Sequence, residues 1–133
     1  MTTENQNSLG PGYEVKGSEI RYRDAFNNTL RAELEHDENV LIIGEDISGG
    51  FDKKTKEPLD AWGGPFAATK GLVQDFGVER IMDAPISEAG FVGAAIGAAL
   101  TGLRPIVDLM YFDFTTVAFD QLLSNAAKSR YMF

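Results

Sequence analysis

Cysteine is absent from the 133-residue sequence, and basic charge and long apolar runs are scarce. Without cysteine there can be no disulfide framework, thiolate nucleophile or cysteine-ligated metal, which suits a cytoplasmic location. Acidic residues outnumber basic residues by 20 to 12, and the net charge of -8 repels nucleic-acid backbones and anionic membranes. The longest small and apolar run, 89–103, falls short of the roughly 20 residues that cross a bilayer. We therefore expect a cytoplasmic protein with no nucleic-acid or membrane partner.

The sequence also has few residues that ligate metals. Its single histidine, His36, stands at the end of a polar segment with no second histidine nearby, so we expect no metal site. Ser87 lacks the Gly-x-Ser-x-Gly pattern of a hydrolase nucleophile and is interpreted as a helix cap.

The length and composition indicate one domain. With 44% hydrophobic residues, 133 residues can bury one modest core but hardly two. Residues 1–17 are polar, contain glycine and proline, and lack the basic start and apolar stretch of a secretory signal. We expect them to form a flexible N-terminal arm, with the folded domain in residues 18–133.

Helix-like and strand-like segments alternate after residue 18. The expected helices cover residues 18–35, 66–76, 87–101 and 115–131, and the expected strands cover residues 40–44, 80–83 and 105–111. A long glycine-rich loop, 47–65, joins the first strand to the second helix. The alternation predicts an α/β fold with a mostly parallel sheet flanked by helices. Because only three strands are clear, we expect the sheet to be incomplete.

Two of these helices carry marked apolar faces. The first aligns Tyr22, Phe26, Leu30 and Leu34 on one stripe, and the last is expected to bury Val117, Phe119, Leu122, Leu123 and Ala126. Both faces should pack against the sheet or against a neighbouring helix.

Acidic and aromatic residues follow the expected strands. Open α/β sheets bind ligands at the carboxyl ends of their strands, where Glu45, Glu88 and the 112–114 loop emerge. A carboxylate such as Glu88 in the first turn of a helix is also stabilised by the helix dipole and the free backbone amides. The residue pattern alone favours this structural interpretation over a catalytic one.

Four segments resemble a known family: GEDISGG (44–50), WGGPFAATKGLVQDFG (62–77), RIMDAPISEAGFVGAAIGAALTGLRPIVDLMYFDF (80–114) and AFDQLLSNAAKSRYM (118–132). In order and spacing they resemble the pyrimidine-binding domain of the beta subunit of the thiamin-diphosphate-dependent first component of 2-oxo acid or acetoin dehydrogenase complexes. The resemblance implies an oxidoreductase component with a fold of the transketolase pyrimidine-domain type. It also implies that residues 18–133 are a partial domain of a truncated subunit.

The resemblance gives Glu88 a catalytic role. In the family, the glutamate at this position meets a ring nitrogen of the cofactor's aminopyrimidine. A carboxyl group in a partly dry pocket has a raised pKa, so it can share a proton with the ring and favour the imino tautomer that activates the thiazolium carbon.

Four other residues match family positions. Phe114 would lie against the face of the aminopyrimidine with Met110 packing nearby, although a core role is the alternative. Glu45 and Asp120 match acidic positions that line a water-filled proton passage between two active sites. The alternatives there are a solvated strand-end glutamate and a helix-capping aspartate.

The resemblance also implies partners. The Gly-Asp-Gly segment followed by asparagine, which binds the diphosphate and magnesium in the family, is absent here, so the alpha subunit would hold that half of a shared thiamin diphosphate. A second beta subunit and, through a C-terminal domain missing here, the acyltransferase core would be further partners. We expect the isolated chain to be inactive.

Three alternatives remain open. The chain could be the pyrimidine domain of a transketolase-like or deoxyxylulose-phosphate-synthase-like enzyme, although GEDISGG and FDQLLSNAAK favour the first family. It could also be a non-catalytic interaction module that retains the fold. Among substrates, the glycine-rich loop that ends in DAWGG (60–64) favours acetoin slightly over 2-oxo acids.

Overall fold

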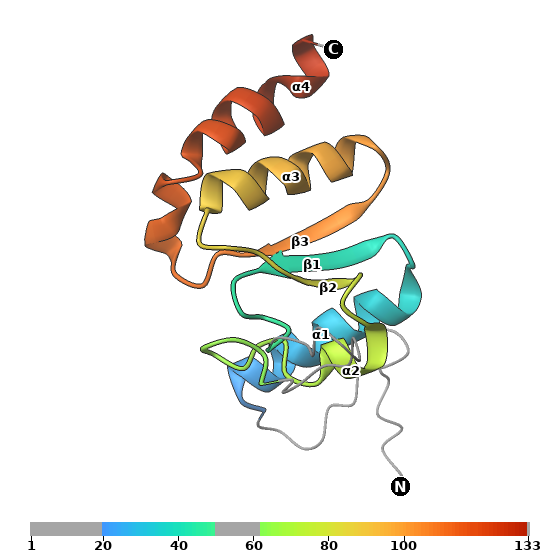
Figure 1. Cartoon of the computed structure of the whole chain (residues 1–133). Coiled ribbons are helices and arrows are strands. Elements are labelled where there is room, and N and C mark those ends of the chain that lie inside the picture. The colour runs from blue at the N-terminus through green and yellow to red at the C-terminus, as the bar shows by residue number, and fades with distance from the viewer. Residues whose placement is uncertain (1–19, 50–61, 133) are drawn as a thin grey trace, which may run out of the picture.

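The computed structural model describes residues 20–49 and 62–132, which form a parallel sheet between layers of helix (Figure 1). In chain order the elements are α1 (Tyr22–His36), β1 (Val40–Gly44), α2 (Leu72–Phe76), β2 (Ile81–Asp83), α3 (Glu88–Leu100), β3 (Arg104–Asp108), the 3-10 helix η1 (Phe112–Thr116), the π-helix η2 (Gln121–Ala126) and α4 (Ala127–Met132). The expected N-terminal arm and residues 50–61 of the long loop lie outside the described residues.

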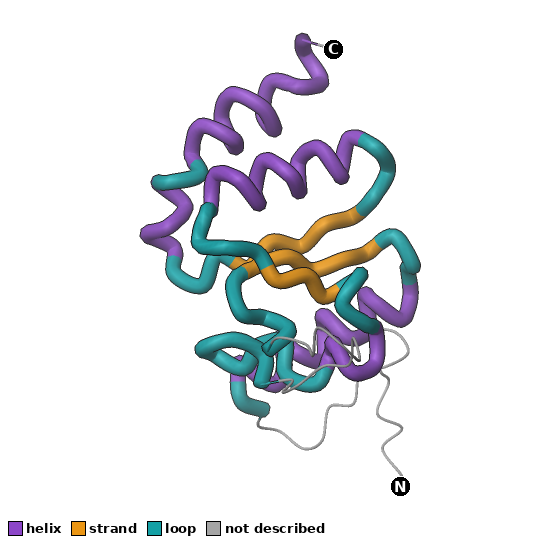
Figure 2. Tube along the Cα trace, viewed as in Figure 1, coloured by secondary structure: helices purple, strands orange, loops and turns teal. Residues whose placement is uncertain are grey.

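The sheet has three strands in the order β2-β1-β3, and both pairings are parallel. In register, Gly44 at the end of β1 stands opposite Asp83 of β2 and Asp108 of β3. The carboxyl ends of all three strands therefore meet at one edge (Figure 2). The α/β fold with a parallel sheet, predicted from the sequence, is confirmed.

Side chains that alternate along β1 supply two cores, one on each face of the sheet. The core toward α1 and α2 contains Leu30, Leu34, Val40, Ile42, Ile47, Leu72, Val73 and Ile81. The core toward α3 contains Phe91, Val92 and Ala118, with Ile43 and Val107 packed against it. Figure 1 shows α1 and α2 on one face, α3 on the other, and α4 beyond α3.

Left-handed residues shorten two predicted elements. In place of a helix over 66–76, turns lead to the short α2, because Ala67 and Gly71 adopt φ values of 53° and 80°, which a right-handed helix cannot include. β3 ends at Asp108 rather than at Tyr111, since Met110 has a φ of 58°. Ser87 precedes α3 as predicted, but its side chain makes no capping hydrogen bond.

The C-terminal segment differs most from the prediction. Instead of one helix over 115–131, the chain forms η1, η2 and α4 in succession. Val117, Phe119 and Leu123 are 56%, 55% and 50% exposed, and Ala126 is also exposed, so the prediction that these four residues are buried is wrong. The 3-10 and π geometry departs from the 3.6-residue period on which the prediction rested. Leu122, which was also predicted to be buried, does pack toward α3, together with Ala118.

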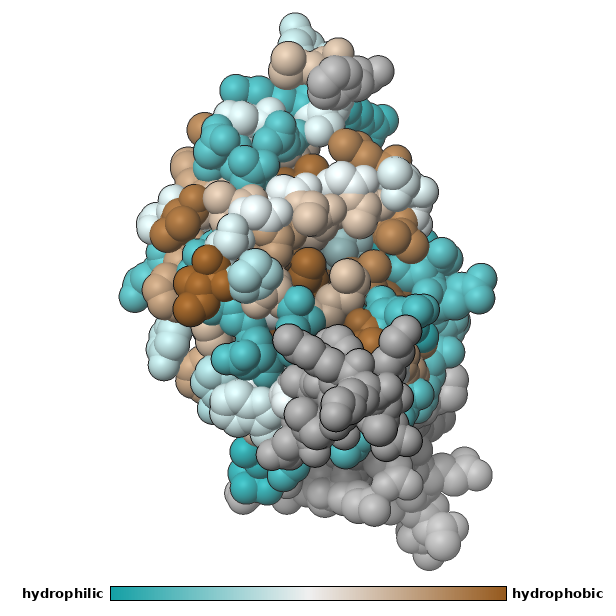
Figure 3. Space-filling model, viewed as in Figure 1, coloured by the Kyte–Doolittle hydropathy of each residue, from teal (hydrophilic) through white to brown (hydrophobic). Residues whose placement is uncertain are grey.

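Apolar side chains reach the surface across α3, where pale and brown patches interrupt the polar surface (Figure 3). Within the described ranges, every helix is too short or too polar to cross a membrane.

Candidate functional site

Acidic side chains gather at the carboxyl edge of the sheet. Asp83 and Asp108 end β2 and β3, Glu45 directly follows β1, and Glu88 begins α3. The segment from Ala84 to Ser87 carries the chain from β2 to α3 in a few residues, so Glu88 stays near this edge. Ligands of open parallel sheets bind at this position.

Glu88 is buried, with only 9% of its surface exposed. It stands in the first turn of α3, where free backbone amides and the helix dipole stabilise a negative charge. Its side chain therefore combines partial dehydration with a favourable local field. A carboxylate held in this way is suited to hydrogen bonding with a ligand group at the edge of the sheet.

Glu45 is buried beside Glu88 and is 7% exposed. Burial, and then the neighbouring charges of Glu88, Asp46 and Asp108, raise the pKa of Glu45 above its ordinary value. Burial dominates because the charged form loses hydration, and each nearby carboxylate adds repulsion. The structure thus brings together two of the predicted site residues, Glu45 and Glu88.

Asp120 lies apart from this pair. It is exposed, and its carboxylate accepts a hydrogen bond from the Gln121 side chain at 3.3 Å. Among the described residues, Asp120 does not belong to the charges that act on Glu45. The structure does not bring the two predicted passage residues together within this chain.

Phe114 belongs to a row of aromatic rings. Its ring meets Tyr111 edge to face at 5.7 Å between centroids, and Tyr111 meets Phe66 at 5.2 Å in the same geometry. Phe114 is half-buried. Met110 is also half-buried, and its backbone N–H donates to Asp108 Oδ1 at 2.7 Å.

Two residues with positive φ follow the strands at this edge. Asp46 comes two residues after the end of β1 with a φ of 54°, and Met110 follows the end of β3 with a φ of 58°. Non-glycine residues adopt this conformation at an energetic cost, and such strain concentrates at functional sites.

A hydrogen-bonded brace supports the loop after β1, and sequence reasoning missed it. Asp83 accepts the backbone N–H of Ser48 at 2.8 Å and also accepts the Ser48 hydroxyl. The buried Thr69 hydroxyl donates to the carbonyl of Ile47 at 2.7 Å. The position of Asp83 at the end of a predicted strand was a usable signal, whereas the contact of Thr69 depends on tertiary packing.

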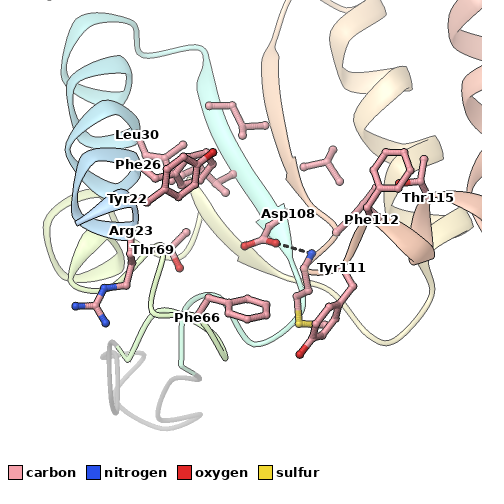
Figure 4. Close-up of a pocket in the computed structure, with 15 residues that line it drawn as sticks. Tyr22, Arg23, Phe26, Leu30, Phe66, Thr69, Asp108, Tyr111, Phe112 and Thr115 are labelled. Atoms are coloured by element: carbon pink, nitrogen blue, oxygen red, sulfur yellow. Dashed lines mark hydrogen bonds between the residues drawn. The ribbon is translucent and has the colours of Figure 1, made fainter. Parts of the chain in front are cut away.

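A groove of about 720 Å³ opens beside the acidic edge (Figure 4). Its walls include Tyr22, Phe26 and Leu30 of α1, Phe66, Met110 to Phe112, and Thr115, and its floor includes Ile106, Val107 and Asp108. Of the five predicted site residues, only Met110 lines this groove. Asp108 connects the groove to the acids, because it lines the groove and also raises the pKa of Glu45.

Metal ligands do not cluster in the part of the chain that the structure describes. Within residues 20–49 and 62–132, no three histidine, cysteine or acidic side chains are placed to hold one ion.

Comparisons with known proteins bear on this site. The family model described as "Transketolase, pyrimidine binding domain" matches residues 18–133. The chain is 52% identical over 114 residues to the acetoin:2,6-dichlorophenolindophenol oxidoreductase subunit beta of Bacillus subtilis. These aligned residues cover 86% of this chain and 33% of that protein. The subunit of the same name in Cupriavidus necator is 49% identical over 109 residues, which cover 82% of this chain and 31% of that protein.

A second group of relatives is less similar. The human mitochondrial pyruvate dehydrogenase E1 component subunit beta is 40% identical over 114 residues, covering 86% of this chain and 28% of that protein. The chain thus spans about a third or less of the length of these relatives.

Proposed function

Since the chain belongs to the transketolase pyrimidine-binding domain family, we propose that it is the aminopyrimidine-binding part of a thiamin-diphosphate-dependent beta subunit. The enzyme would be the decarboxylating or acetoin-cleaving oxidoreductase component of a dehydrogenase complex. The names of the relatives support a two-subunit enzyme over a single-chain transketolase, because they are described as beta subunits. The higher identity to the acetoin enzymes favours acetoin over pyruvate as substrate.

One observation carries the proposal. Glu88 is buried at the start of α3, at the carboxyl edge of the sheet, beside a second buried carboxyl group, Glu45. A pair of buried carboxyls, of which one (Glu45) has a raised pKa, is characteristic of sites that transfer protons. A purely structural glutamate in a first helical turn has no need of a buried acidic neighbour.

The donor set fits an aminopyrimidine ring. A carboxyl oxygen of Glu88 would share a proton with a ring nitrogen, and Phe114 and Met110 would contact the ring. When bound, thiamin diphosphate supplies the nucleophilic carbon and the electron sink for cleavage next to a carbonyl. Glu88 would supply the proton and fix the orientation of the ring.

Glu45 would serve as a proton reservoir behind Glu88. Its raised pKa favours the protonated form, so one proton can be shared between the two carboxyls. We propose that Glu45 and Asp120 line a proton passage to a second active site, with Asp120 completing it across an interface between subunits.

Other parts of the site would come from partners. An alpha subunit would hold the diphosphate and magnesium, in keeping with the missing Gly-Asp-Gly segment. A second beta subunit and an acyltransferase core would complete the complex, and the isolated chain would be inactive. The absence of cysteine supports a cytoplasmic location for this chain.

The test combines the chain with its candidate alpha subunit, magnesium and thiamin diphosphate. Calorimetry would measure cofactor binding, and assays with acetoin and several 2-oxo acids would measure turnover. We expect Glu88→Gln to abolish turnover and Glu33→Gln, which changes an exposed carboxylate on α1, to leave it unchanged. If the chain bound the alpha subunit equally well with and without thiamin diphosphate and gave no turnover, it would instead be a non-catalytic interaction module.

A further inference from the structure

The loop that carries Glu45 is held on both sides by one short segment. Before Glu45, the carbonyl of Gly44 accepts the backbone N–H of Ala84 at 2.7 Å. After Glu45, the carboxylate of Asp83 accepts the backbone N–H of Ser48 at 2.8 Å and also accepts the Ser48 hydroxyl. Asp83 and Ala84, which are consecutive in the chain, therefore bracket the loop.

The same segment leads directly to Glu88. Asp83 is the last residue of β2, and the connection 84–87 runs from it to Glu88, the first residue of α3. Glu88 is also the first of the neighbouring charges that act on Glu45, so the two glutamates lie close together. The hydrogen bonds of Asp83 and Ala84 thus join the start of the connection to Glu88 with the loop of Glu45.

Regular strand pairing does not hold this loop in place. The ladder between β1 and β2 ends at the pair Gly44 and Asp83, and Asp46 turns the chain with a φ of 54°. A side chain must therefore supply an acceptor for the N–H of Ser48, a residue that is only 2% exposed. Asp83 is exposed, so its carboxylate closes the outer side of the loop. An ionised acceptor makes these hydrogen bonds stronger than a neutral one would.

Asp83 affects Glu45 through these hydrogen bonds rather than through its charge. The charged groups that face Glu45 are Glu88 on α3, Asp108 at the end of β3 and Asp46 on its own loop. Among the described residues, Asp83 does not belong to this set, although it ends the strand beside β1.

From these contacts we propose that Asp83 is a positioning residue, which holds the Glu45 carboxyl buried beside Glu88 through its hydrogen bonds to Ser48. Its part in catalysis rests on the proposed function, in which the two glutamates share a proton. Without the Asp83 carboxylate the loop would loosen, and water would reach Glu45. The charged form of Glu45 would then be favoured, and the pair would lose the shared proton.

Two substitutions at Asp83 separate the hydrogen bonds from the charge. Asp83→Ala removes the acceptors, so we expect it to lower the pKa of Glu45 toward its ordinary value. Asp83→Asn keeps an oxygen for the Ser48 N–H, and its amide can donate to the Ser48 hydroxyl, so the pKa of Glu45 should stay as in the wild type. Carboxyl-carbon NMR titration of the full chain measures both.

Arg80→Met is the matched control, because Arg80 makes similar side-chain hydrogen bonds at the other end of the sheet. Its guanidinium donates to the carbonyls of Asp37 and Val40 at 2.7–2.9 Å. The control should lower stability without changing the pKa of Glu45. An unchanged pKa in Asp83→Ala, or a pKa lowered equally in Asp83→Asn or in Arg80→Met, would overturn the role of Asp83.

A milder variant covers the case in which Asp83→Ala does not fold. Ser48→Ala removes only the hydroxyl donor and should lower the pKa of Glu45 by less than full removal of the Asp83 carboxylate. If Asp83→Ala does not fold, an unchanged Glu45 titration in Ser48→Ala would overturn the role of Asp83 in its place.

Turnover with the alpha subunit, magnesium and thiamin diphosphate tests the catalytic consequence. We expect Asp83→Ala to lower kcat by about tenfold or more and to leave KM within about twofold, because Asp83 acts through Glu45 and not on the substrate. Asp83→Asn should keep kcat within about twofold of the wild type; an equal loss of kcat in both variants would contradict the positioning role. If the wild type gave no turnover, the proposed function would fail, whereas the titration of Glu45 would still decide whether Asp83 holds it.

Discussion

At the scale of single residues, Glu45 and Glu88 share one edge of the sheet but differ in their surroundings. Glu88 has the amides of the first turn of α3, whereas Glu45 follows a strand and faces three other acidic groups. Burial and these acidic neighbours therefore oppose ionisation of Glu45.

The pKa of Glu45 should depend on Glu88. Glu88 is the first of the neighbouring charges that raise this pKa, after burial itself. We expect Glu88→Gln to lower the pKa of Glu45 toward its ordinary value, because one repulsive charge is removed. Carboxyl-carbon NMR titration would measure it, with Glu35→Gln on the exposed side of α1 as control. An unchanged Glu45 titration would show that the two groups are not electrostatically coupled.

Burial of Glu45 should also make stability depend on pH. Its folded pKa lies above the ordinary value of 4.5, so the folded state holds the proton more tightly than the unfolded state. The proton on Glu45 therefore stabilises the folded state fully below pH 4.5, and this stabilisation is lost as the pH rises through the folded pKa of Glu45. Glu45→Gln should therefore flatten the stability profile in this range and raise stability at neutral pH. Urea unfolding between acidic and neutral pH measures both effects. If the free energy of unfolding of the variant kept the wild-type dependence on pH, Glu45 would not be its source.

At the scale of elements, local sequence patterns predict some segments and not others. Val40–Gly44 was predicted with correct bounds because a short β-branched run has few alternatives. α2 is shorter than expected because Ala67 and Gly71 adopt left-handed conformations that a right-handed helix cannot include. The C-terminal segment departs from regular helical periodicity, so its apolar residues do not fall on one buried face.

Because β1 packs closely against β3, any side chain at Gly44 should destabilise the fold. A Cβ at Gly44 would lie 2.9 Å from both the Cβ and the carbonyl oxygen of Asp108. Gly44→Ala should therefore destabilise the chain by about 1–3 kcal/mol through strain in the ladder. At Gly97 on α3 a Cβ meets nothing within 4 Å, so Gly97→Ala should stabilise by about 0.5–1 kcal/mol. Denaturant unfolding of the two variants compares them directly, and equal effects would refute the close approach.

The buried hydrogen bond from the Thr69 hydroxyl should stabilise the loop after β1. Thr69→Val keeps the side-chain shape but removes the donor to the carbonyl of Ile47, and should destabilise by about 1–3 kcal/mol. Thr29→Val is the matched control, because the exposed Thr29 hydroxyl bonds only to the carbonyl of Ala25 within α1. A loss no larger for Thr69→Val than for Thr29→Val would mean that water replaces the buried bond.

At the scale of the whole molecule, strand order determines which residues meet. The sequence places Glu45 just after a strand and Glu88 at the start of a helix, but it does not specify that β1 is the central strand. That order sets Glu45 beside both Asp108 and Glu88. The resemblance to a family selected these residues, whereas the brace of Asp83 and Thr69 and the groove along β3 emerge only from tertiary structure.

The same topology separates two surfaces in one small chain. The carboxyl edge carries the acids, and the outer edge of β3 carries the groove, with Asp108 adjoining both.

In the proposed site, the Glu88 carboxyl faces a ring nitrogen of the cofactor. The most direct test compares binding of thiamin diphosphate with binding of an analogue in which carbon replaces that nitrogen, using the wild-type chain and Glu88→Gln, each paired with the alpha subunit and magnesium. We expect the replacement to weaken binding to the wild-type pair, and we expect the variant to bind both compounds about equally. An equal loss of affinity in wild type and variant would contradict it, because the two groups would then act independently.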